Sequence, residues 1–287
     1  MGVLKTINHF EQDPEKMNGA PGGIYSNVDD LCSWMLVHLN KGKYGKNLEQ
    51  QLFSEANHKE MWKIHTTTNA NSDPRYNSHF AGYGLGWGLS DVKGNMMVRH
   101  GGGLPGMVSM TTLIPDLNLG VVILSNTDSG LSYYVTQTII DSYLGLDNNE
   151  WVDKAYERAQ ESQTHADSVT TQVWQTVQSA NNDHIELENF VGVYEDKWFG
   201  KIEILLKDNQ LWFRSYRSPK LNGPMSFYKA NAFAIKWEQL DMNGDAFAIF
   251  SLDEEGKAHS IRMKGISPNI DFSFDFQDLD LQRIQSK

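Results

Sequence analysis

The sequence predicts an α+β chain in two parts: an antiparallel sheet with covering helices, then a small all-β, barrel-like domain. Helical periodicity and short strands mix over residues 1–145, and polar, partly helical residues form a connector over 146–185. Short β-rich runs then recur roughly every ten residues over 186–287. A chain of 287 residues is long enough for about two domains of ordinary size.

Composition and charge exclude several classes of protein. Hydrophobic residues make up 40% and charged residues 21%, which is ordinary globular usage rather than the composition of a disordered chain. The net charge of −11 disfavours nucleic acid and anionic membrane surfaces as partners. No apolar run approaches the roughly 20 residues of a membrane span. Residues 1–20 lack the apolar core and cleavage site of a signal peptide.

Cysteine and histidine usage bears on metal sites. The single cysteine, Cys32, excludes an intramolecular disulfide and a cysteine-based zinc site. The nine histidines form no HExxH motif and no tight pair. We therefore expect no metal and no cofactor.

Two helices and a polar loop open the first part. Apolar residues at helical spacing predict a helix over 26–41, with Ser26 as its cap and Asp29 completing a capping box. A shorter helix is predicted over 54–64, followed by a polar loop over 65–79.

Strands follow the polar loop. Large residues alternate with glycines over Tyr83–Leu89, which predicts a strand with one bare face, as occurs where a backbone or ligand comes close. The short loops that follow imply antiparallel neighbours, and the last helix can cover one face of the sheet. These later elements are three strands and a helix, at Met96–His100, Met107–Ile114, Leu119–Asn126 and Ser129–Leu144.

The β-rich runs of the last part predict a small antiparallel barrel or sandwich. We expect Trp198, Trp212 and Trp237 to pack in its core. The candidate strands are Phe190–Tyr194, Lys201–Leu206, Gln210–Ser215, Phe227–Tyr228, Ala232–Trp237, Ala246–Leu252, His259–Lys264 and Asp271–Phe276.

Three short motifs match known patterns in an unsuitable context. Residues 101–106 satisfy the dinucleotide pattern GxGxxG, but a predicted strand follows them where that site needs a helix. Ser90 and Lys93 satisfy SxxK, but they bridge a strand end and a turn, whereas the motif needs a helix to place both side chains on one face. Tyr25-Ser26-Asn27 satisfies YxN where the first helix begins.

His100-Gly101-Gly102, between two predicted strands, carries the most specific signal. It resembles the third motif, Lys-Thr-Gly or His-x-Gly, of the serine hydrolases related to class C β-lactamases and D-alanyl-D-alanine carboxypeptidases. Residues 83–87 resemble the family's GYGLGW strand, and residues 22–31 resemble its Gly-Gly helix entry. The resemblance covers about 20–145, so residues 1–145 are expected to be the C-terminal portion of such a hydrolase domain, with a β-lactamase/transpeptidase-like fold.

A second resemblance covers about 186–280. Residues 190–194, 199–200 and 209–211 resemble the small lipocalin-like β-domain that often follows this hydrolase domain.

The resemblance implies a site for acyl transfer to or from an ester, small peptide or amide through an acyl-enzyme. It assigns catalytic roles to His100 and to the Gly103 N–H, and substrate binding to Gly101, Gly102 and Tyr83. A preorganised N–H aimed at the developing oxyanion contributes about 3–4 kcal/mol. His100 replaces the more usual lysine and offers a hydrogen bond instead of a permanent charge, which favours ester or small-peptide substrates over β-lactam carboxylates.

The sequence departs from the family before its helix entry. Family members carry the nucleophilic SxxK and the YxN motif there, whereas residues 1–20 contain no SxxK. We therefore expect a C-terminal part without activity of its own, partnered by a separately encoded N-terminal half, with the strand at 83–89 exposed.

Two alternatives stay open. One is a non-catalytic module that binds a ligand, and the other is an intact enzyme that uses Ser90, Lys93 and Tyr25. Relatives are commonly exported, and the compartment stays open.

Overall fold

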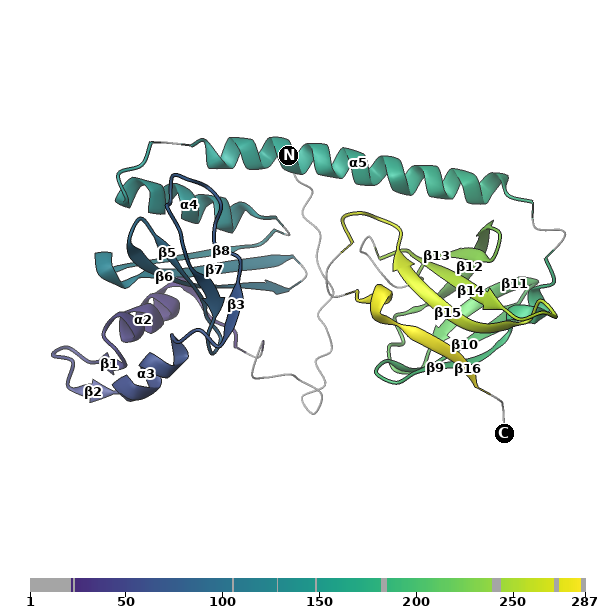
Figure 1. The fold of residues 1–287 in the computed structure, drawn as a ribbon, viewed down its shortest axis with the longest axis horizontal. Helices are drawn as coiled ribbons and strands as arrows, with labels where there is room; N and C mark the ends of the chain where they lie inside the picture. The colour runs from purple at the N-terminus through teal and green to yellow at the C-terminus, as the bar shows by residue number, and fades with distance from the viewer. Residues whose placement is uncertain are drawn as a thin grey trace. The chain divides into compact units, whose positions relative to one another are not determined.

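The computed structural model describes residues 22, 24–104, 106–127, 129–147, 149–181, 185–238, 244–270 and 274–284. The chain divides into two compact units, Met1–Glu157 and Arg158–Lys287. We call them the sheet unit and the barrel unit (Figure 1). The predicted α+β class, with a sheet and helices followed by a closed barrel, is confirmed.

The sheet unit is built on six antiparallel strands in the order β3-β4-β5-β6-β7-β8. Neighbours in the sheet are neighbours in the chain, so the predicted meander is confirmed. The strands are β3 (Thr66–Thr68), β4 (Ala81–Tyr83), β5 (Gly88–Val92), β6 (Asn95–Leu104), β7 (Met107–Ile114) and β8 (Leu119–Ser125).

Helices cover both faces of this sheet (Figure 1). Helix α2 (Val28–Leu39) lies on one face, where Met35 packs with Leu89 and Val98. Helix α4 (Leu131–Tyr143) lies on the other, where its Ile140 joins a separate apolar cluster. Alternate residues of the central strands therefore enter two different cores, as the two-residue period of a strand requires.

The helix caps are partly as predicted. The predicted Ser26 cap is wrong, because the extended residue before α2 is Asn27, whose side chain accepts a hydrogen bond from Asp30 N at 3.0 Å. The second helix begins where it was predicted, with Ser54 as the cap of α3 (Glu55–Met61), but it ends at Met61 and not at 64. A two-stranded hairpin, β1 (Lys43–Tyr44) with β2 (Gln50–Gln51), separates these helices.

The predicted strand over Tyr83–Leu89 is wrong, because the chain turns there. Gly84 N donates to Trp87 O at 2.8 Å, and Gly86 has φ +80°, a region that favours glycine. The predicted close approach is confirmed, since a β-carbon on Gly84 would lie 2.2 Å from Met61 O. The predicted loop over 65–79 carries the short strand β3 instead of being irregular throughout.

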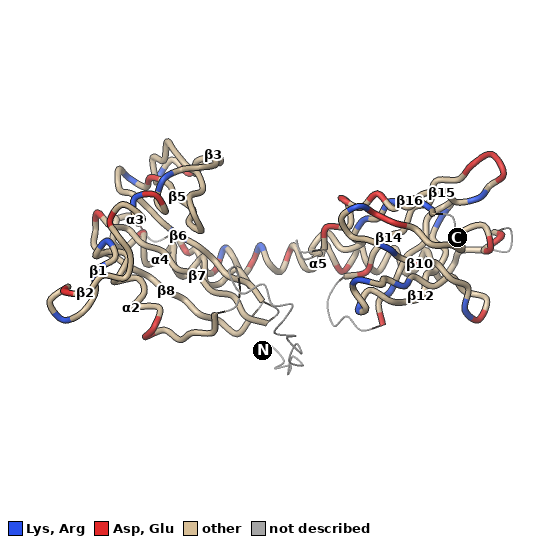
Figure 2. Tube along the Cα trace, turned by 90° about the horizontal axis from the view of Figure 1, so that it is seen from below, with Lys and Arg blue, Asp and Glu red and all other residues tan. Residues whose placement is uncertain are grey.

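Helix α5 (Trp151–Ser179) occupies most of the predicted connector. Its first turn belongs to the sheet unit, where Trp151 Nε1 donates to Asp141 at 2.7 Å. Its later turns belong to the barrel unit, where Val173 packs with Ala234 and Ile266. Acidic and basic residues both occur in its first turns, and an acidic run at 253–255 marks the turn after β14 (Figure 2).

The barrel unit is a closed eight-stranded barrel in the order β10-β11-β12-β13-β14-β15-β16-β9. Aromatic side chains fill its core, including Phe213, Phe233 and Phe250, which are each at most 1% exposed. Its strands are β9 (Gly192–Asp196), β10 (Gly200–Lys207), β11 (Gln210–Ser215), β12 (Asn222–Lys229), β13 (Ala232–Ile235), β14 (Ala246–Leu252), β15 (Ala258–Gly265) and β16 (Asp280–Ile284).

Two predictions for the barrel fail. The last predicted strand, 271–276, is wrong at its end: Phe276 begins the 3₁₀ helix η3 (Phe276–Asp278), β16 closes the barrel, and residues 271–273 lie outside the described residues. Trp237 is in the core as expected, but Trp198 is 60% exposed on the β9–β10 turn. Trp212 is also outside the core cluster: it is half-buried, with the Lys207 amine over its ring.

Candidate functional site

Strand β6 runs beyond its neighbour β5, which leaves an open edge. The last residue of β6 that pairs with β5 is Arg99, opposite Gly88. The next five residues, 100–104, pair only with β7 in the described part of the chain, and all are exposed. An unpaired strand edge offers backbone N–H and C=O groups to an incoming extended chain.

His100 and Tyr83 meet at the start of this open edge. The His100 Nε2 atom lies 2.8 Å from the Tyr83 Oη atom, and the ring centroids are 6.0 Å apart. Tyr83 is the last residue of β4, just before the chain turns toward β5. The hydrogen bond orients the imidazole at the point where β6 becomes unpaired.

The three glycines after His100 differ in what surrounds them. A β-carbon on Gly102 would lie 2.6 Å from Ser109 Oγ, and one on Gly101 would lie 3.3 Å from Met110 Cε. Nothing lies within 4 Å of the corresponding position on Gly103. Side chains of β7 therefore lie against Gly101 and Gly102, whereas the space beside Gly103 is free.

Ser109 is a residue of this site that the sequence analysis missed. It lies opposite Gly102 on β7, with its hydroxyl beside that glycine. Its position could have been inferred from the sequence. Leu104 and Met107 are joined by a short turn, such a turn fixes the register of the two strands, and that register places Ser109 opposite Gly102.

The SxxK residues lie elsewhere in the sheet unit. Ser90 is in β5 opposite Met97, toward the far end of the β5–β6 hairpin from His100. Lys93 is in the turn with φ +48°, and its Nζ donates to Leu144 O at 3.3 Å. Among the described residues, no hydrogen bond joins the Lys93 amine to the Ser90 hydroxyl. Tyr25, from the YxN match, is 72% exposed just before α2.

Asp91, next to Ser90, is held by the loop before β4. Its carboxylate accepts hydrogen bonds from the backbone N–H groups of Phe80 and His79, both at 2.8 Å. Burial alone would raise the pKa of Asp91, but these hydrogen bonds outweigh it and hold that pKa below its ordinary value.

The described part of the chain shows neither a metal-binding cluster nor a helix that could span a membrane. Within the described ranges, no three His, Cys, Asp or Glu side chains gather where they could hold a metal ion. No helix of that part of the chain is both long and apolar enough to cross a membrane.

Comparison with known proteins identifies the sheet unit. Residues 5–142 match the family model described as Beta-lactamase. This match, over just under half of the chain, places the sheet unit in the β-lactamase and penicillin-binding-protein-like superfamily of serine hydrolases. Residues 178–283, which include all of the barrel strands except the last residue of β16, match a domain of unknown function, DUF3471.

Individual relatives of this β-lactamase-related chain are distant. It is 26% identical over 166 residues to unguisins hydrolase ungD' of Aspergillus campestris, a match that covers 55% of this chain and 29% of that protein. Among solved structures it is similar to an octameric penicillin-binding protein homologue from Pyrococcus abyssi (14% identity, TM-score 0.37), over 89% of this chain and 46% of that one. It is also similar to SurE with D-Leu (13% identity, TM-score 0.28), over 81% of this chain and 44% of SurE.

The coverage of these relatives is partial. The β-lactamase-related chain spans less than a third of the curated relative and less than half of each solved chain.

Proposed function

We propose that the open edge of β6 forms the oxyanion-hole side of an acyl-transfer site that acts on an ester, small peptide or amide. The observation that carries this proposal is the pairing of His100 with Tyr83 at the residue where β6 loses its β5 neighbour. In a serine hydrolase the nucleophilic oxygen adds to the carbonyl carbon and its proton passes through a base to the leaving group. The acyl-enzyme is then hydrolysed by water.

Gly103 has the proposed role of donating its N–H to the developing oxyanion. The space beside it supports this role, since a tetrahedral intermediate needs room at the donor. Gly101 and Gly102 would let an extended substrate lie along the open edge. His100 would bind the substrate or leaving group through its ring, held in place by Tyr83.

The nucleophilic serine is proposed to come from outside the described residues, with a separately encoded N-terminal half as one source. Lys93 Nζ donates to Leu144 O, and no hydrogen bond between it and Ser90 occurs among the described residues, which supports a serine from elsewhere. The other SxxK spacing, Ser226 to Lys229, lies in strand β12 and not on a helix, and the Lys229 amine lies over the Tyr228 ring, 5.1 Å from its centroid. We therefore propose that this polypeptide alone does not form an acyl-enzyme.

The unpaired outer edge of β8 is a second observation that supports a partner segment. Among the described strands β8 pairs only with β7, and its Leu124 side chain is 39% exposed. A strand supplied by another segment would satisfy this edge and extend the sheet.

The test is covalent labelling with a fluorophosphonate and with a fluorescent penicillin, read by intact-mass spectrometry. We expect no adduct on the chain alone, and an adduct on the partner's serine when the chain is mixed with a segment that carries SxxK and YxN. In that mixture Gly103→Pro, which removes the N–H, should slow labelling at least 100-fold.

Ser90→Ala separates the alternatives. An adduct on the isolated chain that disappears in Ser90→Ala would replace this proposal with the intact enzyme. Stabilisation of the chain by an ester or peptide, with no adduct in any mixture, would favour the binding module.

A further inference from the structure

The sheet unit contains a hollow that the proposed acyl-transfer site does not use. Its volume is about 340 Å³, and residues of the β5–β6 hairpin and of the 3₁₀ helix η1 (Pro115–Leu117) line it. Phe80, Asp91 and Met96 lie side by side in this lining. Asp91 N donates to Phe80 O at 3.3 Å, and Asp91 pairs with Met96 near the start of β6, before His100. Residues opposite each other in antiparallel strands present their side chains on the same face, so these three share one face of the sheet.

Apolar side chains that a ligand can reach form most of this lining. Phe80 is 72% exposed and Ile64 is 42% exposed, while Trp62 and Met96 are half-buried. Ile64 lies close over the sheet because Gly82 has no side chain: a β-carbon there would lie 2.4 Å from Ile64 Cγ2. The apolar body of a ligand would therefore cover surface that is otherwise in contact with water.

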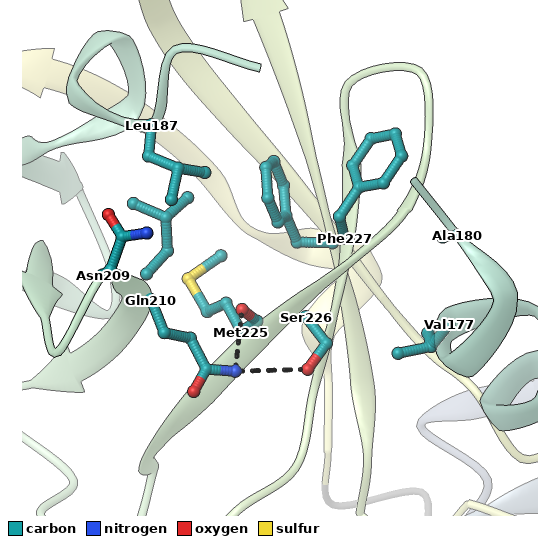
Figure 3. Close-up of a pocket in the computed structure, with 10 residues that line it drawn as sticks. Val177, Ala180, Leu187, Asn209, Gln210, Met225, Ser226 and Phe227 are labelled. Atoms are coloured by element: carbon teal, nitrogen blue, oxygen red, sulfur yellow. Dashed lines mark hydrogen bonds between the residues drawn. The ribbon is translucent and has the colours of Figure 1, made fainter. Parts of the chain in front are cut away.

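The barrel unit has a hollow of another kind beside strands β11 and β12 (Figure 3). Its Leu211 and Met225 side chains are at most 2% exposed and belong to the barrel core. Gln210 Nε2 donates to Ser226 Oγ at 3.3 Å and to Met225 O at 3.5 Å, as the dashed lines in Figure 3 mark. That hollow offers a ligand mostly polar surface, whereas the hollow of the sheet unit offers mostly apolar surface.

The charged residues that line the hollow of the sheet unit are both acidic. Asp91 and Asp116 carry negative charge, and no lysine or arginine is among the described residues of the lining. The lysines next to the lining in sequence have other partners, since Lys63 forms an ion pair with the end of α3 and Lys93 donates to Leu144 O. A positively charged group in the hollow is therefore attracted by two carboxylates, and a negatively charged group is repelled.

The two carboxylates differ in the hydrogen bonds that they can still accept. Asp91 accepts from the backbone N–H groups of His79 and Phe80, and His79 Nδ1 lies 3.2 Å from it. Asp116 accepts from Met96 N through Oδ2, at 2.6 Å. Its Oδ1 has no hydrogen-bond partner among the described residues. One available carboxylate oxygen suits an ammonium group, whereas a guanidinium group needs both oxygens for a bidentate pair.

We infer that this hollow binds a small apolar amine, a primary ammonium group carried on an aryl or alkyl body. The ammonium group donates to Asp116 Oδ1 and is attracted by the charge of Asp91. The apolar body rests against Phe80, Ile64 and Met96. An alcohol of the same shape keeps the apolar contacts but loses the charge, and a carboxylate of the same shape is repelled.

The test is an NMR titration of the full chain at neutral pH and low ionic strength with phenethylamine, compared with phenethyl alcohol and hydrocinnamate. We expect the backbone signals of Ile64, Phe80 and Met96 to shift, with a dissociation constant on the order of 1 mM for a ligand of this size. The alcohol should bind about five-fold more weakly, and the carboxylate at least about ten-fold more weakly. Added salt should weaken the binding of the amine more than that of the alcohol.

Two matched pairs of variants locate the site. Phe80→Ala should weaken the binding of phenethylamine about five-fold, while Tyr143→Ala, exposed at the end of α4, should leave it unchanged. Asp116→Asn should also weaken binding about five-fold, and its amide oxygen can still accept from Met96 N, while Asp147→Asn, exposed after α4, should not.

Four results would each overturn the inference. They are no shift at about 20 mM phenethylamine, equal binding of the amine and the carboxylate, unchanged binding in Phe80→Ala, and equal binding in Asp116→Asn and Asp147→Asn.

Discussion

The six-stranded sheet and the eight-stranded barrel both consist of antiparallel strands, but the sheet has edge strands and the closed barrel has none. Every barrel strand has two partners, and the ring closes between β9 and β16. The described sheet ends at β3 and β8, and part of β6 has a partner on one side only. Closure lets the barrel unit satisfy its own backbone, whereas the open strands of the sheet unit are where a substrate or partner can bind.

The two units also differ in their buried polar groups. In the barrel unit Trp237 Nε1 donates to Gly244 O, and Tyr194 Oη donates to Phe190 O. In the sheet unit the ring nitrogens of His38 are buried without a hydrogen-bond partner among the described residues. Burying a polar group without a partner costs stability, so we expect the two units to respond differently to mutation and to pH.

The largest expected effect is in the barrel core. Phe250 is fully buried, with its ring 4.9 Å from that of Phe190 and 5.7 Å from that of Phe233. Phe250→Ala should lower the free energy of unfolding of the barrel by about 3–5 kcal/mol. The control, Ile249→Ala, changes a neighbouring side chain that is 39% exposed and should cost less than about 1 kcal/mol.

Urea unfolding followed by NMR signals from each unit would measure the effect of Phe250→Ala. An equal shift of the sheet-unit transition would show that the two units unfold together, and the contrast between them would be lost.

The next largest effect is the pH dependence of the sheet unit. Burial and then the nearby His58 lower the pKa of His38 from 6.5 to about 4. Below pH 6.5 His38 therefore binds a proton in the unfolded chain but stays neutral in the folded chain. The free energy of unfolding of the sheet unit thus falls as the pH drops from 6.5 toward 4. The loss should be about 3 kcal/mol, at about 1.4 kcal/mol per unit of pKa.

The variant His38→Phe isolates the effect of this imidazole. The side chain packs among the rings of Trp34, Phe53 and Trp87, so a phenyl ring suits the site. Urea unfolding at several pH values should show a shallower loss of sheet-unit stability in the variant than in the parent chain. An unchanged slope would assign the pH dependence to other groups.

The third effect concerns the buried carboxylate of Asp141. It accepts hydrogen bonds from Tyr76 Oη at 2.6 Å and from Trp151 Nε1 at 2.7 Å, which tie α4 to the loop before β4 and to the start of α5. Asp141→Asn should destabilise the sheet unit by about 1.5–3 kcal/mol in thermal or urea unfolding. Asp147→Asn, on an exposed position after α4, should change it by less than about 0.5 kcal/mol. Equal losses of stability in the two variants would show that the hydrogen bonds of Asp141 do not stabilise the sheet unit.

The smallest effect compares two glycines of the sheet unit. A β-carbon on Gly84 would meet Met61 O at 2.2 Å, so Gly84→Ala should cost about 1–3 kcal/mol in unfolding free energy. Gly103→Ala, with nothing within 4 Å, should change stability by less than about 0.5 kcal/mol. A large loss in Gly103→Ala would mean that the space beside the open edge is filled in solution.

The sequence predicted the elements whose pattern is local. Strands β7, β11 and β14 have the predicted bounds, because alternation and flanking turn residues determine them over a few positions. The strand predicted over Tyr83–Leu89 failed because alternating glycines satisfy the strand period and also permit a turn at Gly86. The strand that closes the barrel lies later than predicted, since closure depends on pairing with β9, which is distant in sequence.

Some features of the candidate site could likewise be predicted from local sequence, and others could not. The His100-Gly101-Gly102 run and its flanking strands were recognisable from the sequence, as was the possible importance of Tyr83. The roles of these residues stay predictions until the labelling experiment is done. The hydrogen bond between His100 and Tyr83 joins residues on different strands and could not be inferred from either strand alone.

By itself, the sequence determined the α+β class, the family signature and the order of the strands, since each depends on composition or on neighbouring residues. Only the tertiary structure decided that β6 extends beyond the end of β5 and that the Lys93 amine donates to Leu144 O. These features depend on where one strand ends beside another and on which side chains meet across the fold. Distances of that kind are set by packing and not by local sequence pattern.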